Sequence, residues 1–178
     1  MRALLALFAL LASPQVYRLE PAHTQVEFTV DSTLHTVHGT FALKRATLRV
    51  DPDGRAEGEL VVDAASGSSG SGARDKRMTH EILETEKYPE IVFVPDRVDG
   101  KLAADGKSEV KLHGVLTIHG AQHEVTADVT AQAIAGGYDA TAKFDVPYIE
   151  WGMKNPSNFL LKVEKVVHIA VHTVVQAS

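Results

Sequence analysis

The stretch Tyr138-Asp-Ala-Thr-Ala-Lys-Phe-Asp-Val146 decides the fold class, because apolar and polar residues alternate along it without a break. Its even-numbered positions are apolar and its odd-numbered positions are polar. Successive side chains of a β-strand point to opposite faces of the sheet. The stretch therefore predicts a strand with one face buried and the other in water.

The same alternation occurs elsewhere in the chain. It is clear in residues 26–30, 37–43, 109–118, 123–131 and 167–171, and shorter runs cover 47–50, 59–63 and 91–94. Residues that tolerate tight turns separate the runs, as in Asp51-Pro-Asp-Gly54, Asp99-Gly100, Asp105-Gly106, His119-Gly120 and Gly136-Gly137. Short strands joined by hairpin turns are typical of antiparallel barrels and sandwiches, so we predict an all-β chain.

The composition is that of one folded domain. The chain has 178 residues, of which 44% are hydrophobic and 23% charged, so it is too apolar to be disordered throughout. The net charge is −5 and no basic run is present, so we expect no nucleic-acid partner, because phosphate binding needs clustered Lys and Arg. Cysteine is absent, which excludes disulfides, thiol nucleophiles and cysteine-bound zinc.

The first residues differ from the rest. Met1-Arg2 precedes an entirely apolar run, residues 3–12, which Ser13-Pro14-Gln15 ends. This pattern is typical of a secretory signal peptide, although a buried N-terminal helix would share it. The run is too short to span a bilayer, which takes about 20 residues. We predict a signal peptide over residues 1–15, a domain over 16–175, and a periplasmic or secreted protein without stable membrane insertion.

One segment lacks the strand pattern. Residues 66–72 read Ser-Gly-Ser-Ser-Gly-Ser-Gly, a composition typical of a flexible linker. After it, Met78, Ile82 and Leu83 have helical spacing, and Pro89 would stop a helix. We therefore predict an irregular segment with one short helix that packs over part of the barrel.

The rows expected to face inward are rich in small residues. They include Gly39, Gly114, Ala127, Ala131, Ala140 and Ala142. Large side chains just fill an eight-stranded barrel, so small ones would leave it hollow unless the phenylalanines fill the space. A hollow apolar interior would bind an apolar ligand. The alternative is that the small residues mark bent strands or lie beneath a covering helix.

Four parts of the chain, in order, resemble the YceI-like proteins. The first is Tyr17-Arg-Leu-Glu-Pro-Ala-His-Thr-Gln-Val-Glu-Phe28 with Val37-His-Gly-Thr-Phe41. The second is Arg74-Asp75 with Met78 and Leu83-Glu-Thr-Glu-Lys-Tyr-Pro-Glu-Ile-Val-Phe93. The third is Val110-Lys-Leu-His-Gly-Val-Leu-Thr-Ile-His-Gly120, and the fourth is Trp151-Gly-Met153 with Val163-Glu-Lys-Val-Val-His-Ile169. The resemblance covers nearly all of residues 16–175.

The resemblance implies a single antiparallel, lipocalin-like β-barrel that is often exported and often dimeric. It also implies that a long amphiphile, typically an isoprenoid, binds inside the barrel, with no catalytic residues and no cofactor. A polar head would stay near Arg74, Lys76 or Arg77. The residues that we expect to contact the ligand are Phe28, Phe41, Met78, Phe93, Leu116, Ala127, Ala142, Phe144, Trp151 and Phe159.

Some of these residues have a purely structural alternative. Trp151 would also suit ordinary packing of a large ring on a loop, and Met78 would suit an ordinary core. For Arg74 and Asp75 we favour a structural ion pair, because a neutral apolar ligand needs neither charge.

Histidines offer a different function, a metal-binding or acid–base site. The chain has nine histidines, and histidine binds zinc and copper well. The candidates are His35, His38, His113, His119, His123 with the adjacent Glu124, and the pair His168 and His172 on one half-buried strand face. The strand pattern places His113 and His119 outward and scatters the others, so we expect neither a metal site nor catalysis.

A ligand-free protein is the third possibility. A filled barrel would act through its surface, and residues 59–63 or another strand edge could pair with a second copy to form a homodimer. The chain has no Gly-x-Ser-x-Gly elbow, phosphate loop or dinucleotide-binding turn. We therefore predict ligand binding without catalysis.

Overall fold

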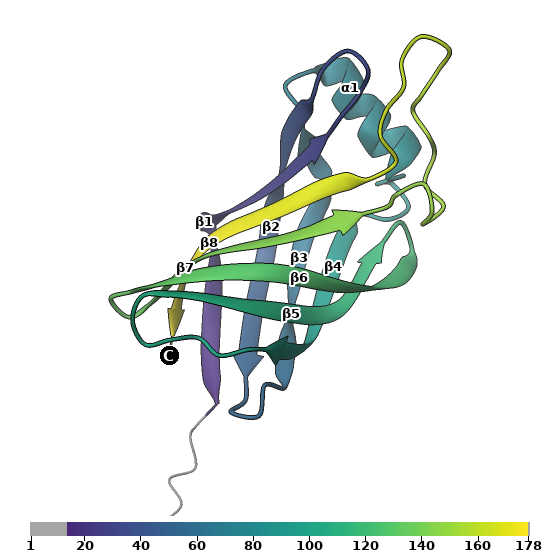
Figure 1. Cartoon of the computed structure of the whole chain (residues 1–178). Coiled ribbons are helices and arrows are strands. Elements are labelled where there is room, and N and C mark those ends of the chain that lie inside the picture. The colour runs from purple at the N-terminus through teal and green to yellow at the C-terminus, as the bar shows by residue number, and fades with distance from the viewer. Residues whose placement is uncertain (1–13, 178) are drawn as a thin grey trace, which may run out of the picture.

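The computed structural model describes residues 14–177 and contains a closed barrel of eight antiparallel strands (Figure 1). Each strand pairs with the next one in sequence, and β1 pairs with β8 to close the barrel. The predicted all-β, single antiparallel barrel is thus confirmed. The strands are β1 (Gln15–Val30), β2 (Val37–Val50), β3 (Ala56–Ser68), β4 (Glu90–Asp99), β5 (Lys107–Ile118), β6 (Ala121–Ile134), β7 (Gly137–Val146) and β8 (Val167–Ala177).

The pairing register brings the apolar rows of neighbouring strands onto one face. Val26 of β1 lies opposite Phe41 of β2 and opposite Val171 of β8. On the other side of the barrel, Phe93 of β4 lies opposite Leu116 of β5. Side chains two residues apart share a face, so a matched pair aligns a row as far as the next register shift, such as the one between Arg18 and Val26 in β1. The apolar rows therefore face the barrel interior.

The predicted short strands are parts of longer ones. Residues 47–50 end β2, residues 59–63 form the middle of β3, and residues 91–94 lie in β4. Residues 60–63 are paired with β2 on one side and with β4 on the other. This part of β3 has no free edge, so the expected pairing of residues 59–63 with a second copy is wrong.

The prediction of a flexible linker over residues 66–72 is also wrong in part. The last residues of β3 and the start of the helix lie within it. The Ser66 hydroxyl donates a hydrogen bond of 2.6 Å to the Asp63 carbonyl and accepts one of 2.8 Å from the Ala42 amide. Short serine side chains favour disorder in linkers, but here they bond to backbone groups where the register of β3 shifts.

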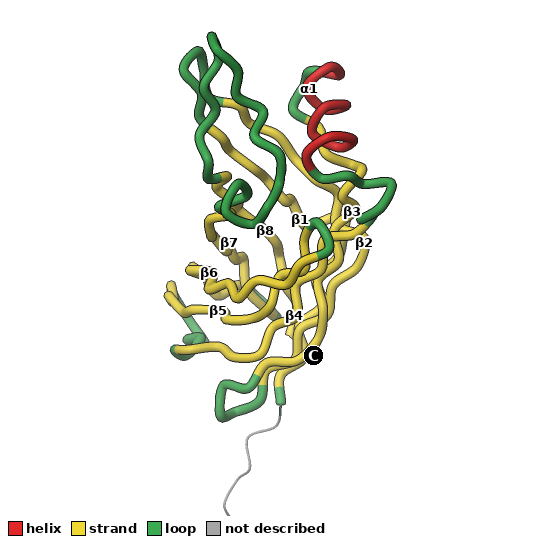
Figure 2. Tube along the Cα trace, turned by 90° about the vertical axis from the view of Figure 1, so that its right-hand side faces the viewer, coloured by secondary structure: helices red, strands yellow, loops and turns green. Residues whose placement is uncertain are grey.

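The short helical segment is confirmed. Helix α1 (Gly72–Arg77) continues into the π-helical segment η1 (Met78–Ile82), and together they lie over one end of the barrel (Figures 1 and 2). The Leu83 amide donates to the Met78 carbonyl at 2.9 Å and completes the wide turn. Met78, Ile82 and Leu83 pack against the apolar core, which explains their helical spacing.

The barrel has two different ends. The α1 end carries α1, η1 and the connections 31–36 and 147–166, as Figure 2 shows. The hairpin end carries the turn 51–54, the loop 100–106 and the two ends of the described chain (Figure 1).

The expected signal peptide, residues 1–15, lies almost entirely outside the described residues, and only its last residue, Gln15, belongs to β1. Within residues 14–177, no helix has the length and hydropathy that crossing a bilayer requires.

Candidate ligand-binding cavity

A large cavity fills the interior of the barrel. Its volume is about 1290 Å³, and residues from all eight strands line it. Sites for drug-sized ligands measure about 300–1,000 Å³, so this cavity suits a larger molecule. The inward row of β8, from Val167 to Val175, borders the cavity along about 26 Å of strand at about 3.3 Å per residue. The cavity is therefore long enough for an extended chain.

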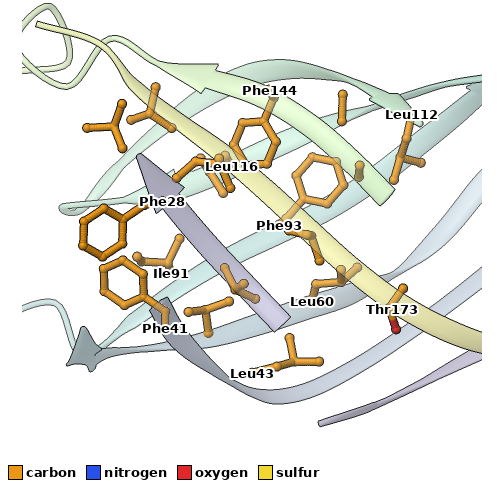
Figure 3. Close-up of a pocket in the computed structure, with 18 of the residues that line it drawn as sticks. Phe28, Phe41, Leu43, Leu60, Ile91, Phe93, Leu112, Leu116, Phe144 and Thr173 are labelled. Atoms are coloured by element: carbon orange, nitrogen blue, oxygen red, sulfur yellow. The ribbon is translucent and has the colours of Figure 1, made fainter. Parts of the chain in front are cut away.

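Hydrocarbon side chains form the middle of the wall. In Figure 3, the Phe28 and Phe41 rings lie side by side, and their centroids are 5.4 Å apart. Phe93 and Phe144 lie in another part of the wall, together with Leu112 and Leu116 (Figure 3). Leu43, Leu60 and Ile91 complete the labelled apolar lining. These groups offer contacts to an apolar ligand but few hydrogen bonds.

The small inward residues serve two different purposes. Ala127, Ala131, Ala140 and Ala142 line the cavity directly, so their missing side-chain bulk becomes free volume. A Cβ at Gly39 would overlap the Phe28 ring, and a Cβ at Gly114 would lie 2.7 Å from Cζ of Phe93. The phenylalanine rings thus lie against glycine backbone, close to the wall. Composition alone did not separate these two uses.

One pair of hydroxyl groups interrupts the apolar wall. Thr173 lines the cavity (Figure 3). Its Oγ1 lies 2.8 Å from Oγ1 of Thr24. Thr24 donates its own hydroxyl proton to the Glu20 carbonyl at 2.9 Å. Thr173 therefore donates to Thr24 and keeps acceptor lone pairs toward the interior. Sequence reasoning missed Thr173, although it continues the inward row Val167, Ile169 and Val171.

At the α1 end, Ser69 organises the polar residues. Arg74 donates from Nε to Oγ of Ser69 at 2.7 Å and from Nη2 to the Ser69 carbonyl at 2.9 Å. The Ser69 hydroxyl donates to Asp75 Oδ1, which also accepts the Ser69 amide at 2.8 Å. Arg74 and Asp75 are thus joined through Ser69, and the expected direct ion pair between them is wrong.

Arg74 also faces the cavity. Ser69, Arg74, Arg77 and His35 all line its α1 end, and Arg74 Nη1 lies 3.5 Å from Nε2 of His35. The His35 side chain is exposed to solvent, so the cavity reaches the surface here. This end therefore combines an opening with positive charge.

At the hairpin end, aromatic side chains line the cavity. The Tyr17 and Tyr138 rings meet edge to face with centroids 6.2 Å apart, and the Tyr138 hydroxyl donates to the Ala103 carbonyl at 3.1 Å. Burial, with a smaller contribution from Tyr138, raises the pKa of Tyr17, so this phenol stays neutral at ordinary pH. Leu102 lines the cavity from the adjacent loop.

Eight of the ten residues expected to contact a ligand line the cavity. They are Phe28, Phe41, Met78, Phe93, Leu116, Ala127, Ala142 and Phe144. Trp151 does not line it: its ring stacks on His123 at 3.9 Å between centroids and packs against the apolar core. Phe159 lies on the connection between β7 and β8 with its side chain in solvent, because no strand orients that part of the chain.

The histidines are separated in space. Within residues 14–177, no group of three or more His, Asp or Glu side chains is placed to hold a metal ion. His113 instead bonds to Asp99 at 2.9 Å, and His168 bonds to Asp145 at 2.7 Å. His168 is exposed, but His172 is half-buried, like Ala170 and Val174 on the same strand face, so the expected half-buried face is confirmed except at His168.

His123 is the histidine with the most unusual surroundings. Its Nε2 atom is buried and has no hydrogen-bond partner, and its ring is covered by Trp151. Burial lowers the pKa of His123 and so favours the neutral ring. This stack fixes the loop that carries Trp151 to the start of β6, in the row that Val125 and Ala127 continue.

The sequence and the barrel geometry agree with a known domain. A sequence model described as the YceI-like domain matches residues 17–175, nearly the whole chain. The chain belongs to the YceI-like family. None of the curated protein sequences matches the chain significantly.

Several solved structures share this fold. BcnA from Burkholderia cenocepacia is 18% identical, with a TM-score of 0.71, over 88% of this chain and 98% of BcnA. A polyisoprenoid-binding domain from Saccharophagus degradans, implicated in plant cell wall breakdown, is 17% identical, with a TM-score of 0.63, over 91% of this chain and 98% of that domain. The Campylobacter jejuni YceI protein is 12% identical, with a TM-score of 0.60, over 100% of this chain and 91% of that protein. At such low identities, these similarities show a shared barrel fold and do not identify a ligand of this protein.

Proposed function

We propose that this protein binds and carries an amphiphilic lipid of the isoprenoid or fatty type inside its barrel. The observation that carries the proposal is the cavity of about 1290 Å³, whose middle is lined by hydrocarbon side chains. Each methylene moved from water into such a wall contributes about 0.8 kcal/mol. The similarity to a polyisoprenoid-binding domain supports an isoprenoid chain as the ligand.

The cavity favours binding over catalysis. The charged side chains that line it belong to its ends, such as Arg74 at one and Asp53 at the other. A ligand chain in the middle would meet only apolar groups and the Thr173 hydroxyl. Acid–base catalysis needs a titratable group within hydrogen-bond reach of the reacting atom, which such a chain would not have.

The same proposal includes export. A lipid carrier in the periplasm or outside the cell would need a removable signal, and residues 1–15 have the composition of one. Mass spectrometry of the protein from the periplasmic and culture fractions tests this point. A mature mass that lacks these residues supports export, and an intact N-terminus on a cytoplasmic protein contradicts it.

The ligand is tested by extraction of the protein purified without detergent. Mass spectrometry of the organic extract should show an amphiphile in stoichiometric amount. Ala127→Phe and Ala142→Phe each place a ring in the cavity and should lower the bound amount about tenfold or more, because overpacking of about 1–3 kcal/mol opposes the ligand.

Gln122→Phe is the matched control, because Gln122 is an exposed residue on β6 that does not line the cavity. It adds the same ring to the outside of the barrel and should leave the bound lipid unchanged. An extract without lipid, from protein that also takes up no added isoprenoid alcohol or fatty acid, would overturn the proposed function.

A further inference from the structure

The most exposed large apolar side chains gather at the α1 end. Phe159 is 94% exposed, Leu160 is 82% exposed and Leu34 is 74% exposed. The two other exposed large apolar residues among residues 14–177, Val94 and Ile134, reach only 46% and 44%. An isolated exposed leucine is ordinary, but several together at the tips of neighbouring loops indicate an interaction surface.

These side chains belong to two connections that are bonded to each other. We call residues 31–36 and 154–165 the mouth loops. The Thr33 amide donates to the Lys162 carbonyl at 2.9 Å, and the Glu164 amide donates to the Asp31 carbonyl at 2.8 Å. Figure 2 shows both loops extending beyond the strands at the same end of the barrel. They therefore present Leu34, Phe159 and Leu160 as one unit.

The mouth loops also border the ligand cavity. Ser32 and His35 from the first loop line it, as do Leu161 and Val163 from the second. Leu161 faces the cavity, whereas its neighbours Phe159 and Leu160 are in solvent. Whatever covers the exposed residues thus meets the opening of the cavity.

The charges on these loops are nearly balanced. Asp31 and Glu164 oppose Lys162 and Lys165, while Lys154 bonds to Glu81 at 2.6 Å. Attraction to an anionic surface needs an excess of positive charge, which the mouth loops lack. Their binding energy must therefore come mainly from burial of the apolar side chains.

We propose that the mouth loops dock reversibly on a lipid membrane by inserting Leu34, Phe159 and Leu160 below its head groups, so that the cavity opens toward the bilayer. The choice of a membrane rests on the proposed function, because a lipid ligand leaves and enters a bilayer, and the loops that carry these residues border the opening of the cavity at the α1 end. Phenylalanine and leucine are the side chains that interfacial segments bury at the head-group boundary.

Co-sedimentation with uncharged phosphatidylcholine vesicles tests the docking. The unsubstituted protein should sediment with the vesicles in low and high salt. The affinity of the double variant Phe159→Ser with Leu160→Ser for the vesicles should fall by at least about tenfold, because two large apolar side chains are lost. Ile134→Ser at the hairpin end is the matched control and should bind normally.

Fluorescence gives a second readout that loss of folding cannot imitate. Phe159→Trp should shift its emission to shorter wavelength when vesicles are added, and Ile134→Trp should not. The unsubstituted protein supplies the background of Trp151, its single tryptophan. Failure of the unsubstituted protein to bind phosphatidylcholine vesicles, or undiminished binding by the double serine variant, would overturn the proposal.

Two further outcomes separate this proposal from others. If the double serine variant dissociates a dimer and no form binds vesicles, a second copy covers the mouth loops and the membrane proposal is wrong. If the protein binds vesicles through Phe159 and Leu160 but contains and accepts no lipid, docking stands and the proposed function fails. If both proposals hold, the double variant should still take up dispersed lipid but exchange it slowly with vesicles.

Discussion

The turn 51–54 at the hairpin end and the connection 147–166 at the α1 end join neighbouring strands by different means. In the turn, the Gly54 amide donates to the Asp51 carbonyl at 2.9 Å, and the Gly54 carbonyl accepts the Val98 amide at 2.8 Å. The longer connection forms one isolated bridge, Ser32 with Val163, and has apolar side chains in solvent.

The difference shows that closing a barrel does not close its ends. Strand pairing satisfies the backbone hydrogen bonds of the barrel wall. The loops and side chains at each end must then cover that end separately. At the hairpin end, the Tyr17 and Tyr138 rings meet and a backbone hydrogen bond joins Gly54 to Val98. At the α1 end, Ser69 joins Arg74 to Asp75, and backbone hydrogen bonds join the two mouth loops. Exposed residues line the cavity at both ends, so entry of a ligand at the α1 end rests on the proposed docking of the mouth loops.

The largest change in the free energy of unfolding is expected from glycine substitutions, one at each end of the barrel. Gly54 has φ +90°, and a Cβ there would lie 2.7 Å from the Val98 carbonyl oxygen. Gly54→Ala should cost about 1–3 kcal/mol of unfolding free energy. Thermal unfolding should show a fall in Tm of about 2–4 °C for each kcal/mol.

Gly72→Ala is the control at the α1 end. Gly72 is the first residue of α1, and a Cβ there would meet nothing within 4 Å. This substitution should stabilise the protein by about 0.4–1 kcal/mol, because alanine reduces the entropy of the unfolded chain. Equal destabilisation by both substitutions would remove the contrast between the ends.

A smaller effect is expected from Ser69→Ala. The substitution removes the hydroxyl that accepts from Arg74 and donates to Asp75. It should cost about 1–2 kcal/mol, because partly buried polar groups lose their partner. Hydrogen exchange should quicken at the amides of residues 69–78 and stay unchanged at Gly54 and Val98. Uniform quickening across the barrel would show that the α1 end is not a separate structural unit.

The smallest effect concerns the pH dependence of the α1 end. Because the pKa of His123 is lowered in the folded protein, the unfolded chain takes up a proton first as pH falls. The contribution of this group to stability is full above its unfolded pKa of about 6.5 and declines below it. His123→Phe keeps a ring beneath Trp151 but cannot titrate.

The measurement is the difference in Tm between about pH 7.5 and about pH 5, two values that bracket the ordinary histidine pKa. The decline should be shallower in His123→Phe than in the unsubstituted protein. Identical declines in the two proteins would mean that burial of His123 has no part in the pH response.

The strand rows were predictable because a strand has a fixed period. Val26 and Phe28 in β1, like Ala140 and Ala142 in β7, face inward as their parity requires. The same period places Thr173 in the inward row, although its hydroxyl is polar and the other residues of that row are apolar. The alternation in the sequence therefore predicts most of the cavity wall.

The ends were harder to predict, because no period orients a loop. Phe159 and Leu161 are two apolar residues of one connection, yet only Leu161 lines the cavity. Arg74 and Asp75 are adjacent and oppositely charged, which suggested a direct pair, but the hydroxyl of Ser69 lies between them. Such contacts depend on the fold of the whole segment.

The glycines behind the phenylalanine rings hold the width of the cavity from positions outside its lining. A Cβ at Gly39 would overlap the Phe28 ring and lie 2.5 Å from the Ser68 carbonyl oxygen. A Cβ at Gly114 would overlap the Val94 carbonyl oxygen and lie 2.7 Å from the Phe93 ring. Any side chain at either glycine would therefore push the neighbouring strand as well as the ring, so the room inside the barrel depends on two residues that present no side chain to it.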